Sequence, residues 1–160
     1  MIKIKKLLPK KFSDCYNLII TDNKDQIYFE NLGWKLNQFK NQLLKENNFS
    51  LALFNNNLMI SFVLGDIISI EKIIEYEILL IYVNFNYRQL GYASKLLNKI
   101  PLALNKNQLK KIYLEVSSDN IQAIKLYKHN SFIQTGMRKN YYQFYNKKMD
   151  SLLFEKIIYE

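Results

Sequence analysis

The first third of the chain alternates between strand-like and helix-like patterns of hydrophobic residues. Residues 2–8 begin with the two-residue alternation of a strand, and Pro9 ends that strand. A helix is predicted over about 10–21, and a mostly polar connection over 22–34. Apolar residues at helical spacing predict an amphipathic helix over 36–46.

The middle of the chain has the pattern of a strand meander that runs into a helix. Apolar runs at 49–54 and 58–68 flank the asparagines 55–57, which is the signature of a hairpin with a tight turn. A third, mostly apolar strand is predicted over 75–83. A helix is predicted from about residue 91 onward.

In the last third of the chain a strand pattern and a helix pattern again follow one another, and two predicted strands end it. Pro101 is expected to kink the preceding helix or to end it near residue 100. A strand is predicted at 111–117, a helix over about 119–129, and two final strands within 132–145 and 151–160. The order contains no repeat and no linker, so residues 1–160 are predicted to form one mixed α/β (α+β) domain.

Composition narrows the class of protein. Hydrophobic residues make up 49% of the chain, and no apolar run has the length of a membrane span or a signal peptide, so we expect a cytoplasmic protein without membrane partners. Cys15 is the only cysteine and is expected to be a small buried hydrophobe, and no His, Cys or Asp cluster has metal-ligand spacing. The net charge of +9 suits an anionic partner, or it reflects the lysine-rich bias of A/T-rich codons. Because the lysines are scattered, codon bias is favoured and a nucleic-acid partner is not expected.

The segment YRQLGYASKLL, residues 87–97, is the most informative short stretch. A tight glycine turn between a strand and a helix exposes unpaired backbone N–H groups at the positive end of the helix dipole. Such a turn suits a phosphate group, and Arg88 adds a positive charge nearby. The simpler interpretation is an ordinary helix start in which Gly91 and Ala93 are small for packing. The spacing is neither that of a Rossmann fingerprint nor that of a P-loop.

Three motifs resemble one family. The stretch from Arg88 to Ala93 resembles the Q/R-x-x-G-x-G/A signature of the GNAT acyltransferase superfamily, which binds acetyl-coenzyme A. LEVSSDNIQAIKLYKHNSF, residues 114–132, resembles the second signature of that superfamily. MRKNYY, residues 137–142, resembles a run found in its ribosomal-protein alanine N-acetyltransferase branch. The resemblance is strong over about 75–145, and over the first 70 residues it extends only to element order and Trp34.

The resemblance implies a curved, mostly antiparallel mixed sheet of about seven strands, flanked by about four helices, with a splayed central pair of parallel strands. Acetyl-coenzyme A would enter the gap between strands 75–83 and 111–117. Backbone groups of one strand end would pair with the pantetheine arm, amides of the glycine turn would hold the pyrophosphate, and an asparagine would meet the cofactor near its pantetheine end. The implied cofactor residues are Ile81, Tyr82, Val83, Arg88, Gln89, Leu90, Gly91, Tyr92, Ala93, Ser94 and Asn120.

Direct acetylation of an amine requires a base for the ammonium and an acid for the departing thiolate. Glu115, in the apolar strand IYLEV, is the candidate base, and Glu77 on the neighbouring strand is its rival. Tyr127, twelve residues after Glu115, is the candidate acid. Without the resemblance, a surface glutamate and a core tyrosine are the simpler interpretations. His129 is expected to be exposed and to have no catalytic role.

The acceptor is less well defined by the sequence than the reaction. The branch implies the N-terminal α-amine of a protein, with ribosomal-protein alanine as its example. A small-molecule amine, a lysine side chain, and a non-catalytic domain that binds coenzyme A or RNA also stay open. Gln143 stands where the branch often has proline, and Ser131 stands where a glycine usually follows the helix, so Asn130 is expected to take the left-handed conformation. Candidate acceptor ligands are Trp34, Glu77, Arg138, Asn140 and Tyr141.

Overall fold

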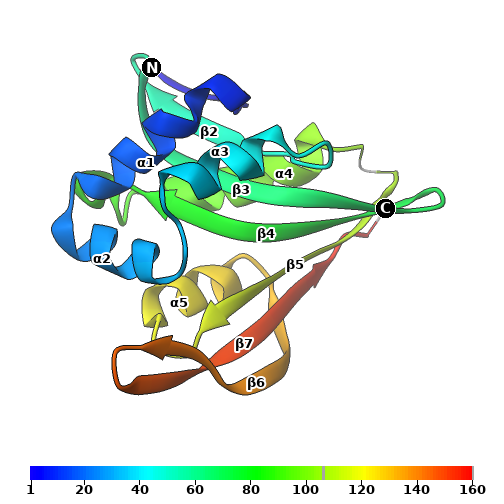
Figure 1. Ribbon diagram of the computed structural model, residues 1–160. Coiled ribbons are helices and arrows are strands. Elements are labelled where there is room, and N and C mark those ends of the chain that lie inside the picture. The colour runs from blue at the N-terminus through cyan, green and yellow to red at the C-terminus, as the bar shows by residue number, and fades with distance from the viewer. Residues whose placement is uncertain (106, 160) are drawn as a thin grey trace.

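One seven-stranded sheet, in the order β1-β2-β3-β4-β5-β7-β6, organises the chain (Figure 1). The computed structural model describes residues 1–105 and 107–159. All neighbouring strands are antiparallel except β4 and β5, as the predicted mixed sheet requires. The strands are β1 (Ile2–Lys6), β2 (Leu51–Asn55), β3 (Leu58–Ile70), β4 (Ile73–Val83), β5 (Leu109–Ser117), β6 (Ile133–Phe144) and β7 (Lys147–Ile157).

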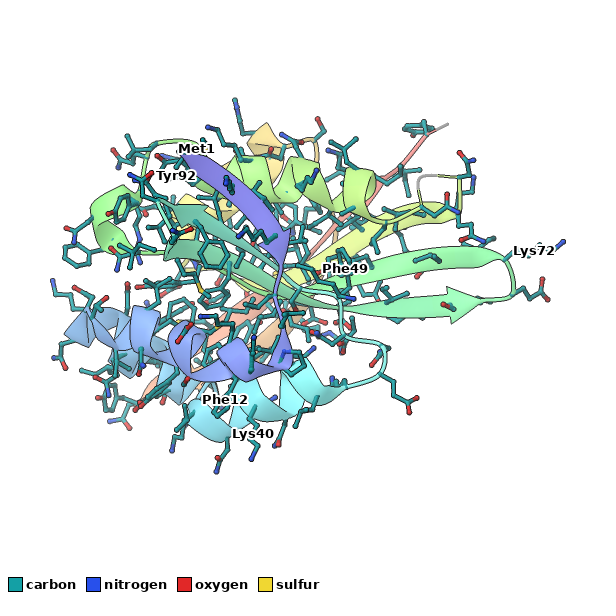
Figure 2. The ribbon with its side chains drawn as sticks, turned by 90° about the horizontal axis from the view of Figure 1, so that it is seen from above. Met1, Phe12, Lys40, Phe49, Lys72 and Tyr92 are labelled. Carbon is teal, nitrogen blue, oxygen red and sulfur yellow. The ribbon has the colours of Figure 1, made fainter. Side chains whose placement is uncertain are left out.

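Helices cover both faces of this sheet. Figure 2 shows α1 and α3, marked by Phe12 and Lys40, on one side of the strands and α4, marked by Tyr92, on the other. Each side has its own hydrophobic core: Cys15, Phe39 and Phe62 belong to one, and Leu96 and Tyr127 to the other. The α-helices are α1 (Phe12–Ile20), α2 (Asn23–Asn31), α3 (Leu36–Leu44), α4 (Tyr92–Ala103) and α5 (Ile121–His129), with short 3-10 turns η1 (Pro9–Lys11) and η2 (Phe85–Tyr87).

Helix α2 lies inside the segment predicted to be a polar connection, so the expectation of about four helices was one too low. Its sequence, NKDQIYFEN, has no apolar stripe, and none of its residues is fully buried. Periodicity therefore could not reveal it. A local signal was present, because the Asp22 carboxylate caps the helix by accepting a hydrogen bond from the Asp25 amide at 2.9 Å.

The two parallel strands separate halfway along their length, as predicted. Their pairing ends at Ile78 and Leu114. In β4 one extra residue, Leu79, stands between the residues that pair with Gly65 and Leu64 of β3. Such a bulge reverses the alternation of side chains. Ile78 accordingly joins the core below α4, whereas Leu80 joins the core below α1 and α3.

The ends of α4 and α5 correct two details of the sequence-based expectations. Of the two effects expected of Pro101, a kink or an end near residue 100, the second does not occur: α4 continues to Ala103, because a proline one turn from the C-terminus removes only one intrahelical hydrogen bond. At the end of α5 the left-handed residue is Ser131 (φ 66°), whereas Asn130 has φ −94°. The amides of Ser131 and Phe132 donate to the carbonyls of Lys128 and Tyr127, so this end is a Schellman motif with serine in the glycine position.

Candidate active site

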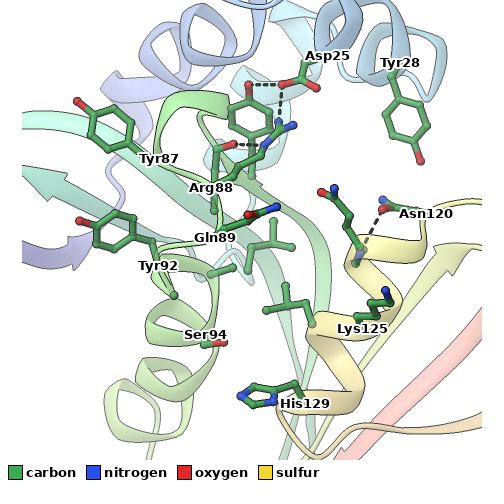
Figure 3. A pocket seen from close by; sticks show the side chains of 18 of the residues that line it. Asp25, Tyr28, Tyr87, Arg88, Gln89, Tyr92, Ser94, Asn120, Lys125 and His129 are labelled. Carbon is green, nitrogen blue, oxygen red and sulfur yellow. Dashed lines mark hydrogen bonds and ion pairs between the residues drawn. The ribbon is translucent and has the colours of Figure 1, made fainter.

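A cavity of about 820 Å³ opens where β4 and β5 part. Figure 3 shows its walls: the turn before α4 on one side, α5 on the other, and α2 above them. Every implied cofactor residue except the exposed Leu90 lines it. The lining residues are Asp25, Tyr28, Phe29, Ile81, Tyr82, Val83, Tyr87, Arg88, Gln89, Gly91, Tyr92, Ala93, Ser94, Asp119, Asn120, Gln122, Ala123, Lys125, Leu126 and His129.

The turn before α4 presents its amides to this cavity. Gly91 is the N-cap of α4 and has φ 78°, a left-handed conformation that glycine adopts without strain. Gln89 also has a positive φ, of 61°. The hydrogen bond that the Lys95 amide donates to the Gly91 carbonyl opens the ladder of α4, so the amides of the first turn, Tyr92 to Ser94, have no intrahelical acceptor. A Cβ built on Gly91 would meet no protein atom within 4 Å, so the space above these donors is open. Both features fit a phosphate group.

Arg88 is bound to protein groups. Its Nε donates to the Val83 carbonyl at 3.0 Å, and its Nη2 forms an ion pair with the Asp25 carboxylate at 2.5 Å. The same Asp25 oxygen accepts a hydrogen bond from the Tyr82 hydroxyl at 2.7 Å (Figure 3). The guanidinium charge lines the cavity, but it is already neutralised by a carboxylate.

The N-terminus of α5 forms the opposite wall. The Asn120 side chain caps this helix by accepting from the Ala123 amide at 3.2 Å. The hydroxyl of Tyr28, from α2, points toward it across the gap (Figure 3). Burial raises the pKa of Tyr28, and hydrogen bonding to the Asn120 side chain opposes that shift. Asn120 thus links α5 to α2 at the inner end of the cavity.

Tyr127, the candidate acid, lies below this wall and is 5% exposed. Its ring packs against Phe132 and Phe154, with centroids 5.7 and 6.2 Å away. Burial raises the pKa of its phenol far above the ordinary value, and the nearby Tyr28 and Tyr142 hydroxyls reinforce the shift. The phenol therefore holds its proton at neutral pH, as a proton donor must.

Glu115, the candidate base, is the first residue of β5 after the last pair of the β4–β5 ladder. Its Oε2 accepts from the Ser151 hydroxyl at 2.8 Å, and its Oε1 pairs with the Arg138 guanidinium at 3.1 Å. The side chain is 25% exposed. Ser151 and Arg138 thus orient the carboxylate from β7 and β6.

The rival base, Glu77, is desolvated. Burial raises its pKa, and the carboxylates of Asp66 and Glu115 raise it further. Asp66 stands opposite it on β3. Lys45 forms an ion pair with Asp66 at 2.8 Å and partly offsets the shift of Glu77. Glu77 and Glu115 therefore form one interacting acidic group on neighbouring strands.

The other candidate acceptor ligands, like Glu77, Glu115 and Tyr127, are not among the residues that line the cavity. Trp34 packs onto Phe39 of α3, with ring centroids 5.2 Å apart, in the core below α1 and α3. Asn140 is exposed, and its amide donates to the Asp150 carboxylate at 2.8 Å. Tyr141 is exposed and stacks beneath the Arg138 guanidinium at 5.6 Å. Arg138 is thus the only one of these four, counting the described contacts, that touches Glu115.

Sequence reasoning missed Asp25, Tyr28 and Ser151. The first two lie on the unpredicted helix α2, and the capping pattern from Asp22 to Asp25 was the signal that would have placed them on a helix. Ser151 is fully buried and faces Glu115 only because β7 pairs with β5, with Ser117 opposite Ser151. No local pattern indicates that pairing.

In the described part of the chain, no group of three or more His, Cys, Asp or Glu side chains is arranged to hold a metal ion. None of the described helices is long and apolar enough to cross a membrane.

Comparisons with known proteins agree with this geometry. Residues 12–132 match the Acetyltransferase (GNAT) family. Among solved structures, the ribosomal-protein-S18-alanine N-acetyltransferase from Escherichia coli is similar over 100% of this chain and 96% of its own, with a TM-score of 0.83 and 22% identity. NAA60 from Arabidopsis thaliana in complex with acetyl-CoA is similar over 99% of both chains (TM-score 0.77, 21% identity). A spermidine N-acetyltransferase chimera from Vibrio cholerae and hSSAT is similar over 98% of this chain and 95% of its own (TM-score 0.74, 17% identity). No curated protein sequence matches significantly.

Proposed function

The chain belongs to the GNAT acetyltransferase family, and from that premise we propose that it transfers acetyl from acetyl-coenzyme A to the N-terminal α-amine of a protein. A ribosomal protein that begins with alanine is the example favoured by the MRKNYY motif. One observation carries the proposal: Glu115 directly follows the point where β4 and β5 part. A carboxylate held there by Ser151 and Arg138 faces an amine that approaches the gap.

The cavity fits acetyl-coenzyme A on its own chemistry. The amides of the turn from Gln89 to Ser94, of which those of Tyr92 to Ser94 lack an intrahelical acceptor, and the open space above Gly91 would hold the pyrophosphate. The end of β4, which has no strand partner on its β5 side beyond Ile78, offers backbone groups from Ile81 to Val83 to the amides of the pantetheine arm. Bound there, acetyl-coenzyme A supplies an activated acetyl thioester.

The protein's own groups then move two protons. Glu115 accepts a proton from the ammonium of the acceptor, and Tyr127 Oη holds the proton that the departing sulfur requires. An α-amine has a pKa of about 7.7–8.0 against about 10.4 for lysine, so deprotonating it at neutral pH is easier by about 3–4 kcal/mol. A single carboxylate therefore suffices more readily for an α-amine, which favours this acceptor over a lysine side chain.

A small cationic amine is the second candidate. Asp66, Glu77 and Glu115 gather on one face of β3, β4 and β5, and together they attract positive charge. Such a group would serve a di- or polyamine as well as a peptide. An enzyme that acetylates only lysine side chains, or a domain that binds coenzyme A or RNA without catalysis, would give no reaction with a free N-terminal alanine.

Thiol release from acetyl-coenzyme A tests the acceptor. We expect release with a hexapeptide that begins with alanine and none with the same peptide blocked at its N-terminus but containing lysine. Release only with spermidine would favour the second candidate. No thiol release with any of the amines, despite binding of coenzyme A, would contradict an enzymatic function.

Two substitutions test the proposed roles. Glu115→Gln and Tyr127→Phe should each lower turnover tenfold or more while coenzyme A still binds. Matched controls are Glu46→Gln and Tyr159→Phe, which make the same chemical changes at exposed positions. Turnover within twofold of the wild type in both test variants would contradict the mechanism.

A further inference from the structure

Helix α2 bridges the two sides of the gap, although it lacks a fully buried residue. At its first turn Asp25 contacts Arg88 and Tyr82, which belong to the cofactor side. At its last residue Asn31 donates to the Gln143 carbonyl of β6 at 3.2 Å. Figure 1 shows α2 between the end of β4 and the β6–β7 hairpin. Its position depends on a few side-chain contacts, chiefly polar ones.

The contact that Asp25 makes with Arg88 is an ion pair. The Asp25 carboxylate is 15% exposed, and one oxygen accepts from both Arg88 and Tyr82. A charged hydrogen bond with little exposure is stronger than the exposed ion pairs elsewhere on the surface. The Phe29 ring adds an edge contact to Tyr82 at 5.5 Å.

The same contacts limit what Arg88 can do. Its Nε is used by Val83 at the end of β4, and its Nη2 is used by Asp25. The guanidinium group lies over the Tyr82 ring at 5.6 Å. Arg88 therefore connects three elements: the end of β4, the turn before α4, and α2. Arg88 thus holds these three elements together, and the Asp25 carboxylate already balances its charge before any anion binds.

The position of α2 affects the site through Tyr28. This residue lies one turn after Asp25, lines the cavity, and directs its hydroxyl toward Asn120. Its ring also packs near Phe144 of β6, with centroids 6.3 Å apart. A shift of the first turn of α2 would therefore move a wall that both the cofactor and the acceptor side share.

We propose that Asp25 is a positioning residue for acetyl transfer: acting through Arg88 and Tyr82, it holds α2 across the gap and so places Tyr28 beside Asn120. The acceptor readout of this proposal rests on the proposed function. The order of α2 does not, since it can be measured with coenzyme A alone.

Asp25 has a possible competing role, the screening of the Arg88 charge, and this role predicts a different change in the affinity for coenzyme A. If Asp25 only screens Arg88, removing its charge frees a cation beside the phosphate turn, and coenzyme A binds more tightly. If Asp25 positions α2, removing it leaves the affinity for coenzyme A within twofold, loosens α2, and weakens binding of the acceptor. The two roles are therefore separable by experiment.

The test compares Asp25→Ala and the milder Asp25→Asn with the control Asp14→Ala. Asp14, on α1, forms an exposed ion pair with Lys11 of η1 at 2.7 Å, away from the cavity, so its substitution removes a carboxylate without touching α2. Hydrogen exchange is measured over residues 26–31 with saturating coenzyme A, together with the dissociation constant of coenzyme A. Steady-state kinetics with the alanine hexapeptide give KM and kcat.

We expect exchange over 26–31 to become about tenfold faster in Asp25→Ala and less so in Asp25→Asn, and to be unchanged in the control. KM for the peptide should rise about fivefold or more, with kcat within twofold. Unchanged exchange in both Asp25 variants, or tighter coenzyme A with unchanged KM, would overturn the proposal. If the wild type does not acetylate the peptide, only the proposed acceptor fails, and the exchange measurement alone decides the role of Asp25.

Discussion

Replacing Gly91 by alanine isolates the contribution of the phosphate turn. Gly91 has φ 78°, and a Cβ at this position would meet no protein atom within 4 Å. Gly33, at the end of α2, provides a matched control: it has φ 94° and equally open surroundings, but it lies outside the cavity. Gly91→Ala and Gly33→Ala therefore carry the same backbone cost, and only the first places a methyl group over the amides.

The expected magnitudes differ for folding and for binding. Alanine in the left-handed region costs about 1–2 kcal/mol. For a chain of this length that corresponds to a fall in Tm of about 2–8 °C in both variants. Displacing a phosphate from one charge-assisted hydrogen bond costs about 1.5–3 kcal/mol, which is roughly a 10- to 150-fold rise in Kd. Only Gly91→Ala should show that rise.

Thermal unfolding and isothermal titration with coenzyme A measure both effects. If the phosphate binds over Gly91, the two variants lose similar amounts of Tm but differ strongly in their Kd for coenzyme A. Equal affinities, with Tm lowered in both, would show that no phosphate approaches Gly91. In that case the open space above the turn would have another use, and the pyrophosphate assignment would be wrong.

Three further predictions concern stability and reactivity. Ser131→Gly should raise Tm by about 2–4 °C, because glycine removes about 1 kcal/mol of left-handed strain at the end of α5; no gain in a thermal melt would contradict the Schellman assignment. The raised pKa of Glu77 means that the folded protein binds this proton more tightly than the unfolded chain does, so its ionisation lowers stability at neutral pH. Glu77→Gln should therefore raise Tm at pH 7, and the gain should vanish as the pH falls below about 4. Burial raises the pKa of Cys15 to about 12, so a thiol reagent at pH 8 should label the native protein at least a hundredfold more slowly than the unfolded chain.

Local chemistry explains why most elements were predictable. The β2–β3 turn follows from asparagines that tolerate positive φ, and Asn56 and Asn57 have φ 47° and 72°. The α5 start follows from Asn120 as its cap. Each of these features depends on a few adjacent residues, so the sequence displays it directly.

The missed features depend on partners that are distant in the chain. Helix α2 is stabilised by Arg88 and Tyr82, which lie more than fifty residues downstream, rather than by an apolar face of its own. The bulge at Leu79 appears only when β3 and β4 are paired, because the end of β4, from Ile78 to Val83, carries an aliphatic or aromatic side chain at every position. The left-handed residue after α5 was misassigned to Asn130, whose side chain instead donates to Ser94 Oγ at 2.9 Å and to the Leu126 carbonyl at 2.8 Å.

The same distinction separates the donor side of the site from the acceptor side. The turn proposed to hold the pyrophosphate is one continuous stretch from Arg88 to Ser94, so a short motif in the sequence displays it almost completely. The proposed acceptor side draws on several elements: Glu115 of β5 pairs with Arg138 of β6, and Tyr28 of α2 packs near Phe144 of β6, and these contacts arise only from tertiary packing. Substitutions in α2 or the β6–β7 hairpin can therefore alter acceptor choice without changing either family signature. For this reason the acceptor must be assigned from reactions with defined amines, whereas the proposal of acetyl-coenzyme A as donor rests on the family and on this one turn.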